Sequence, residues 1–311
     1  MSPIAIDPET VLSGNAPLAE APHLKPTQHF EQSVDNLAEN PLDRVWRGNK
    51  EGTIRLEGVP DFGEDVYAKR QWIKEHLAGA FQYWGKMGYG EGAAGHITVR
   101  DPVKPDHYWM NPFAVHFSSI TVSKLCLVTP EGYVSSEGAQ LPINTAGFYI
   151  HSAIHEERPE VDAIAHCHSL HGRAWSVFGK PIDMLNQDAC TFYDNQAVYK
   201  SFGGIVLAQE EGENIAKALG KKNMVAILQN HGLLTMGSTV DECVYYFGCL
   251  DRQCKLQLQV EAACANGLTK NIIDDKDAAF TAATLQHPST LYTNFKPDYE
   301  LLCEERPQLF K

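Results

Sequence analysis

Long apolar runs and signal-peptide features are absent from this sequence of 311 residues. No apolar stretch reaches the roughly 20 residues that span a bilayer, and the first residues, MSPIAIDPET, lack a basic start and an apolar core. We therefore expect a cytoplasmic protein without a membrane partner. Basic charge is also scarce, with 26 Lys and Arg residues against 39 Asp and Glu residues, which argues against a general nucleic-acid partner.

Three common signatures of function are missing as well. None of the eight cysteines belongs to a C-x-x-C pair, which argues against zinc ribbons and thiol oxidoreductases. The glycines do not form the strand-G-x-G-x-x-G-helix unit of dinucleotide-binding folds, and there is no convincing G-x-S-x-G nucleophile elbow. We expect most of the cysteines to be buried, small apolar residues in a reducing compartment.

The chain is long enough for one large α/β domain or two small ones, and its 43% hydrophobic and 21% charged residues are typical of a globular protein. Residues 1–60 are rich in proline and polar residues, which predicts an extended or partly disordered N-terminal arm. We assign the main domain to residues 61–270. Residues 271–311 are expected to form a C-terminal extension that packs on this domain or on a neighbouring subunit.

Apolar periodicity and turn residues predict alternating helices and strands in the main domain. Helices are expected at 64–87, at 142–157, from 169 to 178, from near 210, and from Ser238 or Thr239. Strands are expected at 95–100, 124–129, 161–165, 204–208 and 224–228. This order of elements indicates an α/β domain.

The most informative motifs are HCH at 166–168 and NHG at 230–232. In an extended strand alternate side chains share a face, so His166 and His168 point the same way while Cys167 points away. A buried strand leads into each motif, which places the three imidazoles at strand ends. One H-x-H motif is weak evidence, because histidines at strand ends are often ordinary hydrogen-bonded residues. A second strand end with its own histidine strengthens the prediction.

Three imidazoles without an adjacent carboxylate predict an open metal site. Zinc, which we favour, would complete its coordination with water or substrate, and iron(II), manganese(II) and cobalt(II) are alternatives. Structural zinc sites usually have four protein ligands and are rich in cysteine, so we favour a catalytic ion. His171 is expected to pack nearby rather than to bind the ion, and His151 and His155 to form a packed helix face.

Four stretches resemble the class II aldolase/adducin family and stand in its order: GAAGHITVR at 92–100, HSAIHEERPEVDAIAHCHSLHG ending at 172, VYKSFGG at 198–204 and QNHGLLTMG at 229–237. The resemblance covers residues 64–265 and implies a central, mainly antiparallel sheet between helical layers. It also implies a homotetramer with active sites at subunit interfaces. Finally, it implies that His166, His168 and His231 are the metal ligands.

The chain departs from the family pattern at two positions. Related aldolases carry an acid/base glutamate four residues before the position of His151, where this chain has Gly147. Where they have the asparagine of a G-N-x-S motif, this chain has His96. His96 is therefore a candidate catalytic residue that would act as base, acid or anchor. The alternative is an ordinary hydrogen-bonded histidine at a strand end.

Four further residues are candidates for the site. Tyr199 matches the family tyrosine that reaches a neighbouring active site as an acid, with a packing role as the alternative. Asn111, Thr145 and Asp188 are candidate substrate-binding residues. Asp188 and the nearby Asn186 precede Tyr199 in a loop, where structural capping is an equal alternative.

These features favour a metal-dependent lyase that acts on a small keto-acid or hydroxy-carbonyl substrate through a metal-stabilised enolate. Without a glutamate at 147, decarboxylation is favoured over retro-aldol cleavage, because it does not require a substrate hydroxyl to lose a proton. The alternatives are an iron-dependent oxidative decarboxylase or oxidase on the same scaffold and a non-catalytic, adducin-like binding protein. Phosphate-binding loops are not recognisable, so we expect a substrate without phosphate.

Overall fold

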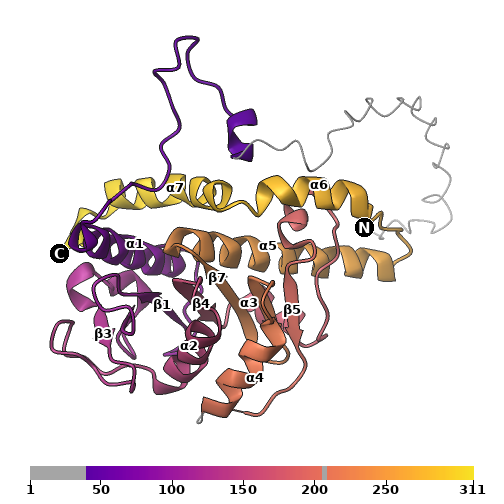
Figure 1. Ribbon diagram of the computed structural model, residues 1–311. Helices are drawn as coiled ribbons and strands as arrows, with labels where there is room; N and C mark the ends of the chain where they lie inside the picture. Colours follow the sequence, from indigo (N-terminus) through magenta and orange to yellow (C-terminus); the bar gives the residue numbers. More distant parts are fainter. Residues whose placement is uncertain (1–39, 205–208) are drawn as a thin grey trace, which may run out of the picture. The chain divides into compact units, whose positions relative to one another are not determined.

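The computed structural model describes residues 40–204 and 209–311. Its strands form one seven-stranded sheet (Figure 1): β1 (His96–Arg100), β2 (Tyr108–Met110), β3 (Cys126–Val128), β4 (Ala163–Cys167), β5 (Gln196–Tyr199), β6 (Val225–Leu228) and β7 (Gly232–Gly237). The α-helices are α1 (Val66–Lys86), α2 (Thr145–Glu157), α3 (Leu170–Ser176), α4 (Gln209–Leu219), α5 (Val240–Ala265), α6 (Asp275–Leu285) and α7 (Pro288–Glu305).

The seven strands lie in the order β3-β2-β1-β4-β7-β6-β5. Every neighbouring pair is antiparallel except β5 and β6, which run parallel. Strand β4 is central, and there His166 pairs with His96 of β1 on one side and with Leu234 of β7 on the other. The mixed α/β fold with a mainly antiparallel sheet between helices confirms the fold class predicted from the sequence.

Helices cover both faces of the sheet (Figure 1). On one face α1 and α5 pack against β1, β4 and β7, in a large apolar core that includes Leu77, Cys167 and Phe247. On the other face α2 and α4 form a smaller core around Ile154 and Ile215. Helix α7 packs on α1 and α5 and adds a further layer on that side.

Side-chain caps explain where three of the helices begin. Asp65, Asn144 and Thr239 are the N-cap residues of α1, α2 and α5, and each side chain accepts a hydrogen bond from the backbone N–H three residues later. Such a bond satisfies one of the four N–H groups that a helix start leaves unpaired. The cap expected at Ser238 or Thr239 is therefore Thr239, and the helix expected from 142 begins at Thr145.

Three strands escaped the sequence-based prediction, namely β2, β5 and β7. Strands β2 and β5 are only three and four residues long, too short to show a clear alternation. Strand β7 is buried along its whole length, so it too lacks an alternating pattern. Of the strand expected at 204–208, residues 205–208 lie outside the described part of the chain.

Residues 45–60 contain no helix or strand, and their side chains are exposed or half-buried. Within the expected arm, Pro41–Arg44 form a 3-10 helix that contacts α6 and α7 and buries Pro41 and Leu42, rather than an extended segment. Residues 1–39 lie outside the described part of the chain, so the boundary of the arm stays a prediction. Helices α6 and α7 make up most of 271–311. Six of the eight cysteines are buried, as expected. Across 40–204 and 209–311, no helix is long and apolar enough to cross a membrane.

Candidate metal centre

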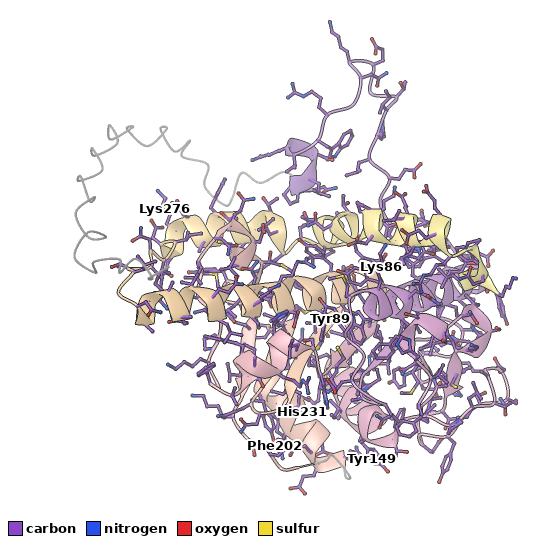
Figure 2. All side chains as sticks on the ribbon, turned by 180° about the vertical axis from the view of Figure 1, so that it is seen from behind. Lys86, Tyr89, Tyr149, Phe202, His231 and Lys276 are labelled. Atoms are coloured by element: carbon purple, nitrogen blue, oxygen red, sulfur yellow. The ribbon has the colours of Figure 1, made fainter. Side chains whose placement is uncertain are left out.

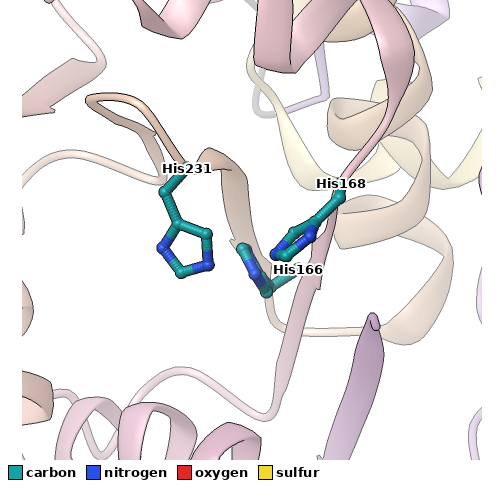
Figure 3. A group of neighbouring side chains, drawn as sticks. All are labelled: His166, His168 and His231. Atoms are coloured by element: carbon teal, nitrogen blue, oxygen red, sulfur yellow. The ribbon is translucent and has the colours of Figure 1, made fainter. Parts of the chain in front are cut away.

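Strand β4 and the turn between β6 and β7 bring His166, His168 and His231 together (Figure 3). The ring centroid of His166 lies 5.2 Å from that of His168 and 4.7 Å from that of His231, and the last two are 4.9 Å apart. One ring nitrogen of each histidine lies within 4.8 Å of the other two. The three side chains are therefore close enough to share one metal ion.

Two local features place these side chains. His166 and Cys167 are consecutive in β4, so they point to opposite faces of the sheet, and Cys167 joins the core beneath α1 and α5. Asn230, in the β6–β7 turn, has a φ angle of 58°, in the left-handed region that asparagine tolerates better than most residues. This turn lets β7 return beside β4 and leaves His231 at the end of the hairpin.

The three imidazoles are neutral near neutral pH. Burial, with added effects of neighbouring histidines, lowers the pKa of His166 well below its usual value. Burial also lowers the pKa of His168, and it lowers that of His231 to about 4. His166 Nδ1 donates to the carbonyl oxygen of Leu233 at 2.8 Å, which leaves Nε2 with a lone pair. Neutral imidazole is the form that binds metal, so the donor set fits a divalent ion.

A cavity of about 530 Å³ contains the three imidazoles, and its walls are mainly apolar. Ile150, Phe113 and Phe202 supply its large apolar side chains, and Figure 2 shows Phe202 near His231. Phe113 is 42% exposed and Phe202 57% exposed, so both rings also present apolar surface to solvent. The size and lining of this cavity suit a small organic ligand.

His96 lines the same cavity and is only 3% exposed. Its ring centroid lies 5.2 Å from that of His166, and neither of its ring nitrogens has a hydrogen-bond partner among the described residues. Burial, together with His231 and His168, lowers the pKa of His96 to about 3. His96 is therefore neutral near neutral pH, which makes it available as a base or a hydrogen-bond partner rather than as a charged acid.

Gly147 and His96 compete for the same space. A Cβ atom at position 147 would lie 2.5 Å from Cε1 and 2.6 Å from Nδ1 of His96, well inside the ordinary contact distance of about 3.5 Å. Glycine at 147 is thus what leaves room for the imidazole. The two departures from the family pattern are coupled in space, because the ring at 96 fills the volume that any side chain at 147 would enter.

Behind His96, three side chains form a hydrogen-bond chain with a single direction. His155 Nδ1 donates to the carbonyl oxygen of Val161 at 3.1 Å, so its neutral Nε2 accepts from the Thr98 hydroxyl at 2.9 Å. The Thr98 oxygen in turn accepts from His151 Nδ1 at 2.8 Å. His151 Nε2 is left as a buried acceptor, and the His151 ring centroid is 4.2 Å from that of His96.

We expect the metal-free protein to lose stability steeply below pH 6.5. Burial lowers the pKa of His96 and of His155 to about 3 and that of His151 well below its ordinary value of 6.5. Below pH 6.5 the unfolded chain therefore binds more protons than the folded chain, so full stability is present above this pH and is lost as the pH falls. Each of these histidines would cost about 1.4 kcal/mol per pH unit.

Urea unfolding of the metal-free protein at about pH 7.5, 6.5 and 5.5 measures this effect. His155→Gln is expected to reduce the number of protons taken up on unfolding by about one. The matched control is His116→Gln, because His116 is exposed. An equal free energy of unfolding at the highest and the lowest pH would contradict the buried, neutral state of the three rings.

Tyr199 and Thr145 do not line the cavity of their own chain. Tyr199 ends β5, where burial and a hydrogen bond with Glu211 raise the pKa of its phenol. Its predicted action on a neighbouring subunit stays a prediction. Thr145 is exposed at the first position of α2, between Asn144 and Ala146, which both line the cavity.

Asn111 and Asp188 also lie outside the lining of the histidine cavity. Asn111 is buried, donates from Nδ2 to the carbonyl oxygen of Gly95 at 3.3 Å, and lines a smaller cavity of about 200 Å³ that shares two alanines with the larger one. Asp188 is exposed in a 3-10 helix (Gln187–Phe192) that packs on α5 and α6. Asn186 caps that helix by accepting a hydrogen bond from the backbone N–H of Ala189 at 3.1 Å. This is the capping role that the sequence predicts as the alternative to substrate binding.

Helix α3, which follows β4, carries two further polar side chains. His171 Nδ1 bonds to Asp251 Oδ2 at 3.0 Å, in agreement with the expected packing role. Arg173 lines the histidine cavity and donates to Glu91 Oε2 at 2.6 Å, and the sequence-based prediction missed it. An arginine on a short helix is ordinary, so only the tertiary structure reveals where its charge lies.

The comparison with protein families agrees with this geometry. Residues 75–258, more than half of the chain, match the Class II Aldolase and Adducin N-terminal domain. The chain therefore belongs to the class II aldolase/adducin family. Class II aldolases typically depend on a divalent metal such as zinc, and members of the family are often homotetramers that act on small substrates.

Three similar proteins narrow the chemistry. Decarboxylase NovR of Streptomyces niveus is 41% identical over 201 residues, which cover 64% of this chain and 74% of that protein. The 4-hydroxy-3-prenylphenylpyruvate oxygenase/4-hydroxy-3-prenylbenzoate synthase of Streptomyces roseochromogenus subsp. oscitans is 40% identical over 201 residues, or 64% and 72% of the two chains. The structure of L-fuculose 1-phosphate aldolase from Glaciozyma antarctica PI12 is 40% identical, with a TM-score of 0.73 and coverage of 81% and 96%. With the fold, these names indicate a lyase.

Proposed function

We propose that this protein is a metal-dependent carbon–carbon lyase that decarboxylates a small keto-acid. The observation that carries the proposal is the convergence of three neutral imidazoles in a mainly apolar cavity. The similar proteins named as a decarboxylase and as a phenylpyruvate oxygenase support it. The three imidazoles also argue against a purely adducin-like binding role, which would not need them.

His166, His168 and His231 would hold one divalent ion, zinc in the first instance, with iron(II), manganese(II) and cobalt(II) as alternatives. When bound, the ion would polarise the substrate's carbonyl oxygen and stabilise negative charge that develops there. In a 3-keto-acid the carboxyl group is on the carbon next to that carbonyl, so loss of carbon dioxide breaks one C–C bond and leaves the electron pair as an enolate, which then takes up a proton. A 2-keto-acid carries its carboxyl group on the carbonyl carbon itself, so it would lose carbon dioxide by the oxidative route described below. No side chain has to remove a proton first, so Gly147 is compatible with the reaction.

The remaining predicted site residues would bind the substrate or donate the proton. His96 would hold the substrate as a neutral hydrogen-bond partner beside the imidazoles, because its ring nitrogens have no other partner among the described residues. Tyr199 of a neighbouring subunit in a homotetramer would protonate the enolate. Asn111 would act through the smaller adjoining cavity, and Thr145 and Asp188 across subunit interfaces.

Oxidative decarboxylation is the second candidate, and the name of the phenylpyruvate oxygenase favours it. In that case iron(II) would take the place of zinc, since three histidines leave positions open for a substrate and oxygen. The same side chains would bind and orient the acid. Consumption of oxygen and a more oxidised organic product would distinguish this reaction from simple decarboxylation.

The test measures release of carbon dioxide, release of aldehyde and consumption of oxygen in the same reaction, with the metal-loaded protein and a panel of keto-acids. We expect carbon dioxide without aldehyde, and no product from the metal-free protein. Oxygen use in step with carbon dioxide would select the oxidative candidate. Aldehyde without carbon dioxide would reject both candidates in favour of retro-aldol cleavage, and bound metal without any turnover would favour a binding protein.

A further inference from the structure

Arg173 carries the one permanent charge among the described residues that line the histidine cavity. It lies on α3, five residues after His168, while the other polar side chains of the lining are histidines and asparagines. Arg173 forms an ion pair with Glu91, which does not itself line the cavity, so the guanidinium is the one cationic donor that the described lining residues offer to a ligand. An anionic group on a ligand would be attracted to this guanidinium.

Glu91 holds Arg173 in place without consuming its binding capacity. The two side chains form one hydrogen bond of 2.6 Å, from Arg173 Nη2 to Glu91 Oε2, and Glu91 closely precedes Ala93 and Ala94 of the cavity wall. A guanidinium has five N–H donors, so one bond to Glu91 leaves donors for a ligand. Arg173 and His168 line the same cavity, which places the guanidinium beside the candidate metal centre.

We infer that the cavity takes an aryl-substituted keto-acid whose carboxylate pairs with Arg173 while its keto oxygen meets the imidazoles. The inference rests on the proposed function, because it uses the same site. A 2-keto-acid such as phenylpyruvate fits the oxidative form of that function, which needs oxygen to release carbon dioxide. A carboxylate matches the planar fork of a guanidinium through two parallel hydrogen bonds, which fix orientation as well as charge. Arg173 would thus set the direction of the carboxylate relative to the keto group.

The apolar walls describe the other end of the ligand. Phe113, Phe202 and Ile150 offer two aromatic rings and a branched aliphatic chain, surfaces that stabilise an aryl group by burial and ring contact. A volume of about 530 Å³ is ample for a ring in addition to a three-carbon acid. A sugar phosphate would instead bring hydroxyl groups that these walls cannot pair, at the cost of their desolvation.

Calorimetric binding to the metal-loaded full chain, without oxygen, tests the inference separately from turnover. The probes are phenylpyruvate, pyruvate, which lacks the ring, and phenylacetone, which lacks the carboxylate. We expect phenylpyruvate to bind at least about tenfold more tightly than either of the others, because only phenylpyruvate offers both groups.

Arg173→Met is expected to weaken phenylpyruvate binding by about 10- to 100-fold and to leave phenylacetone binding unchanged. Arg173→Lys keeps the charge without the planar fork, so it should recover part of the loss. The matched control is Arg55→Met, which removes the same charge from an exposed residue outside the cavity. Its affinities should equal those of the wild type.

Three results would overturn the inference: no binding of phenylpyruvate to the wild type, unchanged binding in Arg173→Met, or an equal loss of phenylacetone binding in that variant. If the wild type bound pyruvate and phenylpyruvate with equal affinity, the cavity would not select for an aryl group, and that part of the inference would be wrong. Measurement of carbon dioxide release tests the proposed function separately from the inference. Arg173-dependent binding without carbon dioxide release, even when oxygen is supplied, would contradict the proposed function and leave the inference standing. Carbon dioxide release together with binding that does not depend on Arg173 would contradict the inference and leave the proposed function standing.

Discussion

Alanine in place of His231 is expected to abolish metal binding and nearly all turnover. The side chain supplies one of three nitrogens that lie within 4.8 Å of one another, and two histidines alone form a much weaker site. Removal of residues that merely orient metal ligands already costs 10- to 100-fold, so we expect turnover to fall by more than about 100-fold. The fold should survive, because His231 is half-buried at a turn and belongs to none of the apolar cores.

Elemental analysis of the purified variant, with thermal unfolding of both metal-free proteins, measures these effects. His171→Gln is the matched control, since His171 lies close in sequence but bonds to Asp251, and glutamine can keep a hydrogen bond to that carboxylate. The control should retain one ion per chain. A full complement of metal in His231→Ala would contradict the ligand assignment.

Alanine at position 147 is expected to lower the free energy of unfolding by about 1–3 kcal/mol, the usual cost of overpacking. At an unobstructed helix position the same change would stabilise the protein by roughly 0.5–1 kcal/mol. Here the new Cβ would stand 2.5 Å from Cε1 of His96, and His96 is buried. A fall rather than a rise in the free energy of unfolding would therefore show that a Cβ atom at position 147 and the His96 ring compete for the same space.

Combination with His96→Ala should remove most of this cost, because alanine lacks all three ring atoms that the new Cβ would meet. Urea unfolding of Gly147→Ala, His96→Ala and the double variant gives the coupling free energy. Additive effects would show that the two positions are independent. In a further variant, Gly147→Glu with His96→Asn recreates the glutamate and asparagine of the related aldolases, and we expect it to release more aldehyde relative to carbon dioxide than the wild type.

Much of the candidate site could be predicted because it is encoded locally. The alternation of side chains in an extended strand places His166 and Cys167 on opposite faces of β4, as the structure shows. Thr239 caps α5 through a contact three residues away, which is again local information. The distant His231 was predicted to join the site because it also follows a buried strand, and the family resemblance implied the same three ligands. No local rule states which strands become neighbours.

The features that were missed depend on the tertiary structure. Strands β2 and β5 are too short to show a periodic pattern. Arg173 became a cavity residue only through the position of α3 beside the segment of Glu91. The link between Gly147 and His96 requires the packing of α2 against β1, which no single stretch of sequence contains.

The β6–β7 hairpin has a consequence for how such chains can change in evolution. Turns are ordinarily where insertions and deletions are accepted, because they lie at the surface and few contacts depend on their length. This turn carries His231, and the strand that follows it offers the Leu233 carbonyl oxygen to His166 Nδ1 at 2.8 Å. One extra residue would displace His231 and also disturb the hydrogen bond that orients His166. We therefore expect natural length variation to fall in other loops and to spare this one.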